Sequence, residues 1–208
     1  MTGLFVTGTD TGIGKTLVSA WLATHWRADY WKPVQSGIAD GTDSGCVEHL
    51  VPGIVIHPST YVLNSPLSPH CSARRDGLRL ELSAFHLPVT PRPLVVEGAG
   101  GVMVPLNESA LMIDLIERLG LPVLIVARSG LGTINHTLMT LEMLRRRPVT
   151  LLGVILNGPP NPANREAIIQ YGRVPVVAEL PPLPVVSAAA LAGLPPPDFL
   201  SCPPEDLL

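Results

Sequence analysis

The chain has 208 residues, of which 46% are hydrophobic and only 15% charged, and its formal net charge is −3. This length suits a single domain, which we expect to span residues 1–208 around a sizeable buried core. The slightly acidic charge gives no reason to expect a nucleic-acid partner. The apolar run 121–127 is too short to cross a bilayer and the N-terminus lacks the basic stretch of a signal peptide, so we expect a cytoplasmic protein with no membrane partner.

Apolar runs alternate with helical patterns along the chain. Strands are expected at residues 3–8, 29–34, 93–101, 121–127, 149–157 and 174–180. Helices are expected at 15–26, 78–85, 111–119, 133–147 and 162–171. Loops with a short helix near 46–50 are expected over 37–69, and irregular structure packed on the domain over the proline-rich tail 181–208. This alternation predicts an α/β fold, a doubly wound and mostly parallel sheet flanked by helices.

A glycine- and threonine-rich turn lies between the first strand and the first helix, in VTGTDTGIGKTLVSAW (residues 6–21). The ordinary phosphate-binding loop, G-x-x-x-x-G-K-S/T, holds phosphates with backbone N–H groups at a helix N-terminus. Five residues rather than four separate Gly8 from Gly14, so this loop is a variant. We expect Lys15 to reach the β and γ phosphates and the Thr16 hydroxyl to bind Mg²⁺, which makes the fold P-loop NTPase-like.

Lysine is scarce in this chain. Of the 14 basic residues, only Lys15 and Lys32 are lysines. Two lysines in a chain that otherwise uses arginine suggest sites that need a compact ammonium charge. The three cysteines, Cys46, Cys71 and Cys202, form no C-x-x-C pair, so neither a disulfide framework nor a zinc site is expected.

Five segments together resemble the dethiobiotin synthetase family. They are VTGTDTGIGKT (6–16), KPVQSG (32–37), VVEGAGG (95–101), GTINHT (132–137) and GVILNG (153–158). The resemblance weakens over residues 38–90 and in the proline-rich tail, and Gly12 stands where familiar members often have glutamate. It implies an ATP- and Mg²⁺-dependent cyclo-ligase that joins CO₂ to 7,8-diaminononanoate (7,8-diaminopelargonate) and releases dethiobiotin, ADP and phosphate.

The implied reaction passes through a carbamate and a carbamic-phosphoric mixed anhydride. Because these species are anionic, the site needs concentrated positive charge and aligned N–H donors. The resemblance assigns catalytic roles to Lys32, Lys15 and Thr11, and it places the substrate against Ser36 as well as Lys32.

The metal ligands implied by the resemblance are Thr16, Asp43 and Glu97. Oxygen donors of this kind suit Mg²⁺. Asp40 lies three residues before Asp43 in the same segment, so either carboxylate is open as the ligand, with Asp43 preferred because it matches the family pattern better.

Nucleotide contacts are carried over from the family in three groups. They are Gly12, Ile13, Gly14, Lys15, Thr16 and Leu17 in the loop, then Asp43, Glu97, Gly98, Ala99 and Gly100, and finally Asn157, Gly158, Pro181, Pro182 and Leu183 near the base or ribose. Base choice falls to Asn157, whose amide can both donate to and accept from an adenine edge. ATP against CTP is left open at this point.

The family also implies a homodimer with active sites at the subunit interface. The distant carboxylate of the substrate meets the start of the partner's helix, where Gly132, Thr133, Ile134 and Asn135 would offer free N–H groups.

Other classes of protein remain as alternatives. A nucleotide-gated switch of the ParA or MinD type is disfavoured because Asp10 stands where those ATPases carry an extra lysine, and a small GTPase because no N-K-x-D motif occurs. A related amide-forming synthetase, such as the ATP domain of a cobyrinate amidase, is disfavoured by the length and by the lack of a glutamine-hydrolysing domain.

Overall fold

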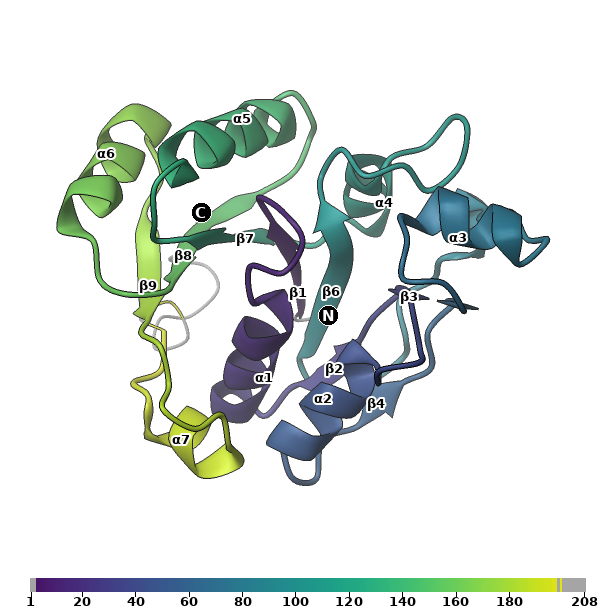
Figure 1. Cartoon of the computed structure of the whole chain (residues 1–208), viewed down its shortest axis with the longest axis horizontal. Coiled ribbons are helices and arrows are strands. Elements are labelled where there is room, and N and C mark those ends of the chain that lie inside the picture. Colours follow the sequence, from purple (N-terminus) through teal and green to yellow (C-terminus); the bar gives the residue numbers. More distant parts are fainter. Residues whose placement is uncertain (1–2, 198, 200–208) are drawn as a thin grey trace.

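The computed structural model describes residues 3–197 and 199 (Figure 1). Its main sheet has seven strands in the order β4-β2-β6-β1-β7-β8-β9, and every neighbouring pair is parallel. The strands are β1 (Gly3–Gly8), β2 (Asp29–Trp31), β4 (Ile56–His57), β6 (Leu94–Gly101), β7 (Val123–Arg128), β8 (Leu151–Asn157) and β9 (Val176–Leu180). The predicted doubly wound α/β fold is confirmed.

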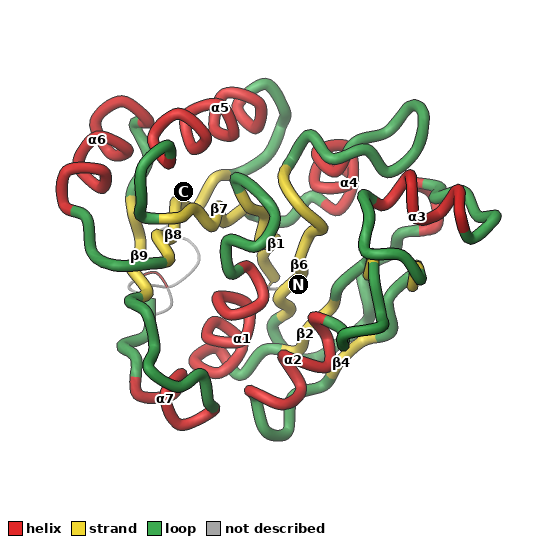
Figure 2. The backbone as a smooth tube through the Cα atoms, in the orientation of Figure 1, coloured by secondary structure: helices red, strands yellow, loops and turns green. Residues whose placement is uncertain are grey.

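Helices cover both faces of this sheet, as the red segments of Figure 2 show. On one face lie α1 (Lys15–Trp26), α2 (Asp43–Leu50) and α7 (Ala188–Gly193). The other face carries α4 (Met112–Leu119), α5 (Thr133–Arg145) and α6 (Pro162–Gly172). Strands buried on both sides have nearly continuous apolar sequences, so the short hydrophobic runs of β1, β6 and β7 predict strands.

The first strand lies in the middle of the sheet, between β6 and β7. Its side chains alternate, so that Leu4 and Val6 join the core beside α1 while Phe5 joins the core beside α4. The chain leaves β1 for one face and β6 for the other, so a crevice opens at the carboxyl ends of these neighbouring strands.

The strand expected over 29–34 is divided in the structure. β2 ends at Trp31, and β3 (Val34–Ser36) pairs instead with β5 (Tyr61–Leu63) in a separate two-stranded sheet. Pro33 lies between the two pieces and has no N–H for the ladder of the main sheet, so the chain changes partners there.

The helix expected over 78–85 is wrong, because that segment holds only the single 3₁₀ turn η1 (Leu82–Ala84). A helix lies earlier, at α3 (Pro69–Arg75), and the helix expected near 46–50 begins sooner, at Asp43. Leu80 and Phe85 are buried against the core from irregular backbone, so their apolar character does not reflect helical packing.

The tail is more regular than expected up to residue 193, because α7 forms there with the Ser187 hydroxyl accepting a hydrogen bond from the Ala190 N–H. Residues 198 and 200–208 of the tail lie outside the described residues. Within the described part of the chain, no helix is long and apolar enough to cross a membrane.

Candidate active site

The predicted phosphate loop connects β1 to α1. Gly14 has a left-handed backbone with φ of 92°, and α1 begins directly after it without a side-chain cap, which leaves N–H groups of the first turn directed at the loop. The Asn157 side chain donates a 2.8 Å hydrogen bond to the Ile13 carbonyl. A Cβ at position 14 would come within 2.1 Å of the Asn157 Nδ2 atom, so both backbone shape and space require glycine.

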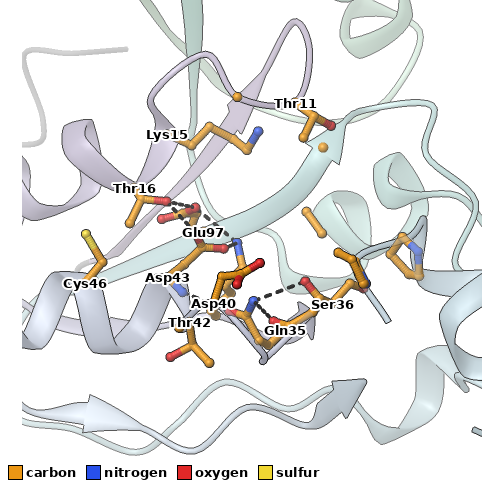
Figure 3. A pocket seen from close by; sticks show the side chains of 18 of the residues that line it. Thr11, Lys15, Thr16, Gln35, Ser36, Asp40, Thr42, Asp43, Cys46 and Glu97 are labelled. Carbon is orange, nitrogen blue, oxygen red and sulfur yellow. Dashed lines mark hydrogen bonds and ion pairs between the residues drawn. The ribbon is translucent and has the colours of Figure 1, made fainter. Parts of the chain in front are cut away.

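A cavity of about 1150 Å³ lies beside this loop, and Figure 3 shows side chains that line it. It gathers most of the residues predicted for catalysis and phosphate binding: Thr11, Gly12, Gly14, Lys15, Thr16, Lys32, Ser36, Asp43, Glu97, Ala99 and Gly100. These residues come from the ranges 11–16, 32–43 and 97–100, and the two lysines of the chain are among them.

At the centre of the cavity wall, four side chains share a network. The Lys32 ammonium lies 2.7 Å from Asp43 Oδ2 and 3.1 Å from Glu97 Oε1. The Thr16 hydroxyl lies 2.9 Å from both Asp43 Oδ1 and Glu97 Oε1. Figure 3 shows Thr16, Asp43 and Glu97 facing one another from α1, α2 and β6.

Sheet register explains why Lys32 meets Glu97. Trp31, the last residue of β2, pairs with Val96 in β6, so the next residue on each chain continues the same alignment. Successive side chains on a strand point to opposite faces, so Lys32 and Glu97 both turn toward the side covered by α1 and α2. Thr16 is the second residue of α1 and Asp43 is the first residue of α2, which completes the network.

Charges in the network support one another. Burial would lower the pKa of the Lys32 ammonium, but the facing Glu97 and Asp43 carboxylates outweigh it and raise that pKa. Burial would raise the pKa of Asp43, and Lys32 reverses this and lowers it. Lys15 differs, because burial lowers its pKa to about 8, offset in part by Glu97 and reinforced by Lys32.

The oxygen donors of this wall fit a magnesium ion. The Thr16 hydroxyl lies within 3 Å of the carboxylates of both Asp43 and Glu97, and Mg²⁺ prefers such hard oxygen ligands. Asp40 also lines the cavity, but it is Asp43 that contacts Thr16 and Lys32. No cluster of three or more His, Cys, Asp or Glu side chains suited to a metal occurs among the described residues.

Sequence reasoning missed two neighbours of the network. The Gln35 side chain accepts a 3.1 Å hydrogen bond from the Asp43 N–H, so it holds the start of α2 against β3. The buried Tyr30 hydroxyl donates a 2.9 Å hydrogen bond to Glu97 Oε2. Gln35 was inside the matching segment KPVQSG, and the two-residue strand period placed Tyr30 on the same side as Lys32.

The residues assigned to the base or ribose are not in the cavity lining. Asn157 contacts the phosphate loop at Ile13, as described. The strand partner of Asn157 in β9 is Leu180, whose carbonyl accepts a hydrogen bond from the Gly158 N–H. Pro181, Pro182 and Leu183 follow Leu180 along the chain.

Other predicted contacts fall into three places. Leu17 packs with the core beside α1, and the Gly98 carbonyl lies 3.4 Å from the Lys32 ammonium.

Gly132 precedes α5 with a left-handed backbone, and Asn135 is exposed. The N–H of Thr133 is donated to the Gly130 carbonyl at 3.2 Å, so the expectation that it is free for an anion is wrong. Ile134 and Asn135 keep that candidate role.

Comparisons with known proteins agree with this arrangement. A family model described as an AAA domain matches residues 2–190. The chain is 68% identical to the ATP-dependent dethiobiotin synthetase BioD of Paramagnetospirillum magneticum, with 98% of each chain covered. It is 47% identical to the protein of the same name from Rhodopseudomonas palustris, covering 95% of this chain and 96% of that one. A ParA family ATPase from Chlorobium tepidum matches in fold with a TM-score of 0.52, at 12% identity over 92% of this chain and 96% of that one.

The parallel sheet, the variant loop at the end of β1 and the helix that follows it define the class of P-loop NTPase-like proteins. Within that class, the identity and coverage of the bacterial relatives decide the family. The chain belongs to the dethiobiotin synthetase family of ATP-dependent ligases, as the five sequence segments indicated.

Proposed function

We propose that this protein uses Mg-ATP to carboxylate 7,8-diaminononanoate and to close the ring of dethiobiotin, in biotin biosynthesis. The family relationship supports the overall reaction. The observation that carries the chemistry is that Lys15 and Lys32, the only lysines of the chain, line one cavity together with Thr16, Asp43 and Glu97. A reaction whose intermediates are all anionic needs such a concentration of cations.

In this proposal, the carbamate forms on one amine of the substrate and lies against Lys32. An oxygen of the carbamate attacks the γ-phosphorus of ATP, the bond to the β-γ bridging oxygen breaks, and ADP leaves. The Lys32 ammonium stabilises the negative charge on the carbamate and on the phosphoryl group in transfer, while Lys15 stabilises the β and γ phosphates. Because the facing carboxylates raise the pKa of Lys32, its ammonium stays charged at neutral pH.

Ring closure follows when the second amine attacks the carbonyl carbon of the mixed anhydride, loses a proton and displaces phosphate. Thr11, Ser36 and the backbone of residues 98–100 would position that amine. Space is available for it, because Thr11, Ser36 and Gly100 all line the cavity. Thr16, Asp43 and Glu97 would hold a bound Mg²⁺, which would supply positive charge to offset that of the phosphates.

We also propose that the base or ribose of the nucleotide lies beside Asn157, Gly158 and residues 181–183.

We further propose that the protein acts in the cytoplasm as one domain and as a homodimer. The carboxylate of the substrate would meet the first turn of α5 in the partner subunit. The support for this step is the exposed α5 N-terminus at Gly132 and Asn135, which lacks a side-chain cap.

The test is a phosphate-release assay with ATP, bicarbonate and 7,8-diaminononanoate, each omitted in turn, together with detection of dethiobiotin by mass spectrometry. We expect phosphate release to require all three and to match dethiobiotin in amount. ATP hydrolysis that ignores the diamine would instead favour a nucleotide-gated switch and contradict the proposal.

A further inference from the structure

Tyr30 holds the Glu97 carboxylate at the centre of the site. Its side chain is fully buried in β2, and its hydroxyl donates a 2.9 Å hydrogen bond to Glu97 Oε2. The other carboxylate oxygen, Glu97 Oε1, is the one that contacts Thr16 and Lys32. The two oxygens of Glu97 therefore have different partners, with Tyr30 on the inner oxygen.

The strand geometry makes this arrangement specific. Tyr30 and Lys32 are two residues apart, so they project from the same face, while Trp31 between them packs into the opposite core. Both reach Glu97, one on each oxygen. Two contacts at different oxygens fix the rotation of the carboxylate plane, whereas Lys32 and Thr16 alone would leave Oε2 buried without a donor.

We propose that Tyr30 is a positioning residue that orients Glu97 so that Oε1 faces Thr16 and the cavity, ready for a magnesium ion. This inference rests on the proposed function, in which Glu97 is a metal ligand. Tyr30 is not among the residues that line the cavity, so it acts through Glu97 and does not touch substrate. Groups that orient metal ligands in this way usually affect metal affinity by about 10- to 100-fold.

The direct test replaces the hydroxyl and keeps the ring, with Tyr30→Phe. Calorimetric binding of ADP is measured in EDTA and then over a series of Mg²⁺ concentrations. We expect ADP binding in EDTA to be unchanged and the Mg²⁺ concentration for half-maximal enhancement to rise roughly 10-fold. A variant that merely loosens the core would weaken ADP binding in EDTA as well.

The matched control is Tyr61→Phe. The Tyr61 hydroxyl also has a hydrogen bond, from the Glu81 N–H at 3.1 Å, but it belongs to the small β3-β5 sheet and does not contact the network. We expect its Mg²⁺ dependence to match that of the unmodified protein. An unchanged Mg²⁺ requirement in Tyr30→Phe would overturn the inference.

A second measurement needs no change at Tyr30 and so does not depend on the variant folding. The chain has three tyrosines, Tyr30, Tyr61 and Tyr171, so labelling with ¹³Cζ-tyrosine gives three resonances that Tyr61→Phe and Tyr171→Phe assign. We expect the Tyr30 resonance to move when Mg²⁺ is added to the ADP complex while the other two stay. A stationary Tyr30 resonance would also overturn the inference.

Failure of this inference is separable from failure of the proposed function. Both measurements use ADP and Mg²⁺ without diamine or turnover. If the unmodified protein shows no Mg²⁺-dependent ADP binding, the proposed function itself is contradicted. If it does, and Tyr30 is indifferent to the metal, only the role of Tyr30 is lost.

Discussion

The Arg128 guanidinium, at the end of β7, lies 2.8 Å from the carboxylate of Asp10 in the phosphate loop. The other oxygen of Asp10 accepts the N–H of Thr11 at 2.7 Å, and the Asp10 carbonyl accepts the Lys15 ammonium at 2.9 Å. One aspartate therefore ties the first half of the loop to the neighbouring strand, while Asn157 ties the second half.

Loss of the ion pair between Arg128 and Asp10 should loosen the phosphate loop more than it destabilises the fold. Its side chains are 43% and 50% exposed, and such pairs stabilise proteins by about 1 kcal/mol or less. We expect Arg128→Ala to raise the KM for ATP several-fold with little change in the free energy of unfolding. Adding Asp10→Asn to that variant should raise the KM for ATP little further. Arg165→Ala, which breaks a similarly exposed pair with Glu179, is the control and should leave the KM unchanged. Strictly additive effects of Arg128→Ala and Asp10→Asn on the KM for ATP would contradict an interaction between the two side chains.

Replacement of Lys32 should affect both turnover and stability. In Lys32→Met, Asp43 and Glu97 face each other without the ammonium between them. Breaking a buried ion pair from one side typically costs about 3–5 kcal/mol. We expect turnover to fall at least about 100-fold, as on losing a charge-stabilising group, and urea unfolding in EDTA to show the lower stability. Near-normal steady-state rates would rule out its proposed role.

Two glycines of the phosphate loop offer a matched pair of variants. Both have positive φ, but a Cβ on Gly12 would meet nothing within 4 Å, whereas a Cβ on Gly14 would collide with the Asn157 amide. We expect Gly14→Ala to abolish measurable ADP binding and Gly12→Ala to weaken it less, since it adds only backbone strain of about 1 kcal/mol. Equal losses in calorimetric titrations would show that the contact with Asn157 is unimportant.

The proposed dimeric site can be tested at Asn135, in the first turn of α5. Asn135→Pro removes one N–H that the helix does not use, at a position where proline is tolerated, and Asn135→Ala keeps it. We expect only the proline variant to raise the KM for the diamine, with the KM for ATP unchanged.

Mixing of two impaired homodimers, assayed at a low diamine concentration, then tests whether sites are shared. If the partner supplies α5, a heterodimer of Asn135→Pro and Lys32→Met subunits has one site with both changes and one site with neither. We expect mixed subunits to regain activity at low diamine concentration. Activity no higher than the average of the two parents would place α5 with the site of its own subunit.

The parts of this structure that sequence reasoning predicted are those set by local pattern. Buried parallel strands are short apolar runs, and the phosphate loop is one continuous segment, so β1, α1 and Lys15 could be placed from nearby residues alone. The family segments then brought Lys32 and Glu97 to the same site.

What could not be predicted depends on distant partners. Nothing near Pro33 shows that β3 will pair with β5 instead of continuing in the main sheet. The contact between Tyr30 and Glu97 joins residues 67 positions apart. Ser68 followed by Pro69 is a local signal for the start of α3, because proline is favoured at the first position of a helix.

The enclosure of both lysines also determines how the protein responds to reagents that acylate amines. Lys15 is 7% exposed and Lys32 3%, so neither side chain offers an amine on the outer surface. With its pKa lowered to about 8, Lys15 holds more of the unprotonated, nucleophilic form near neutral pH than an ordinary lysine does. Reagents used to immobilise or crosslink this protein through lysine would therefore react inside the cavity, at Lys15 and Lys32, and we expect them to abolish activity.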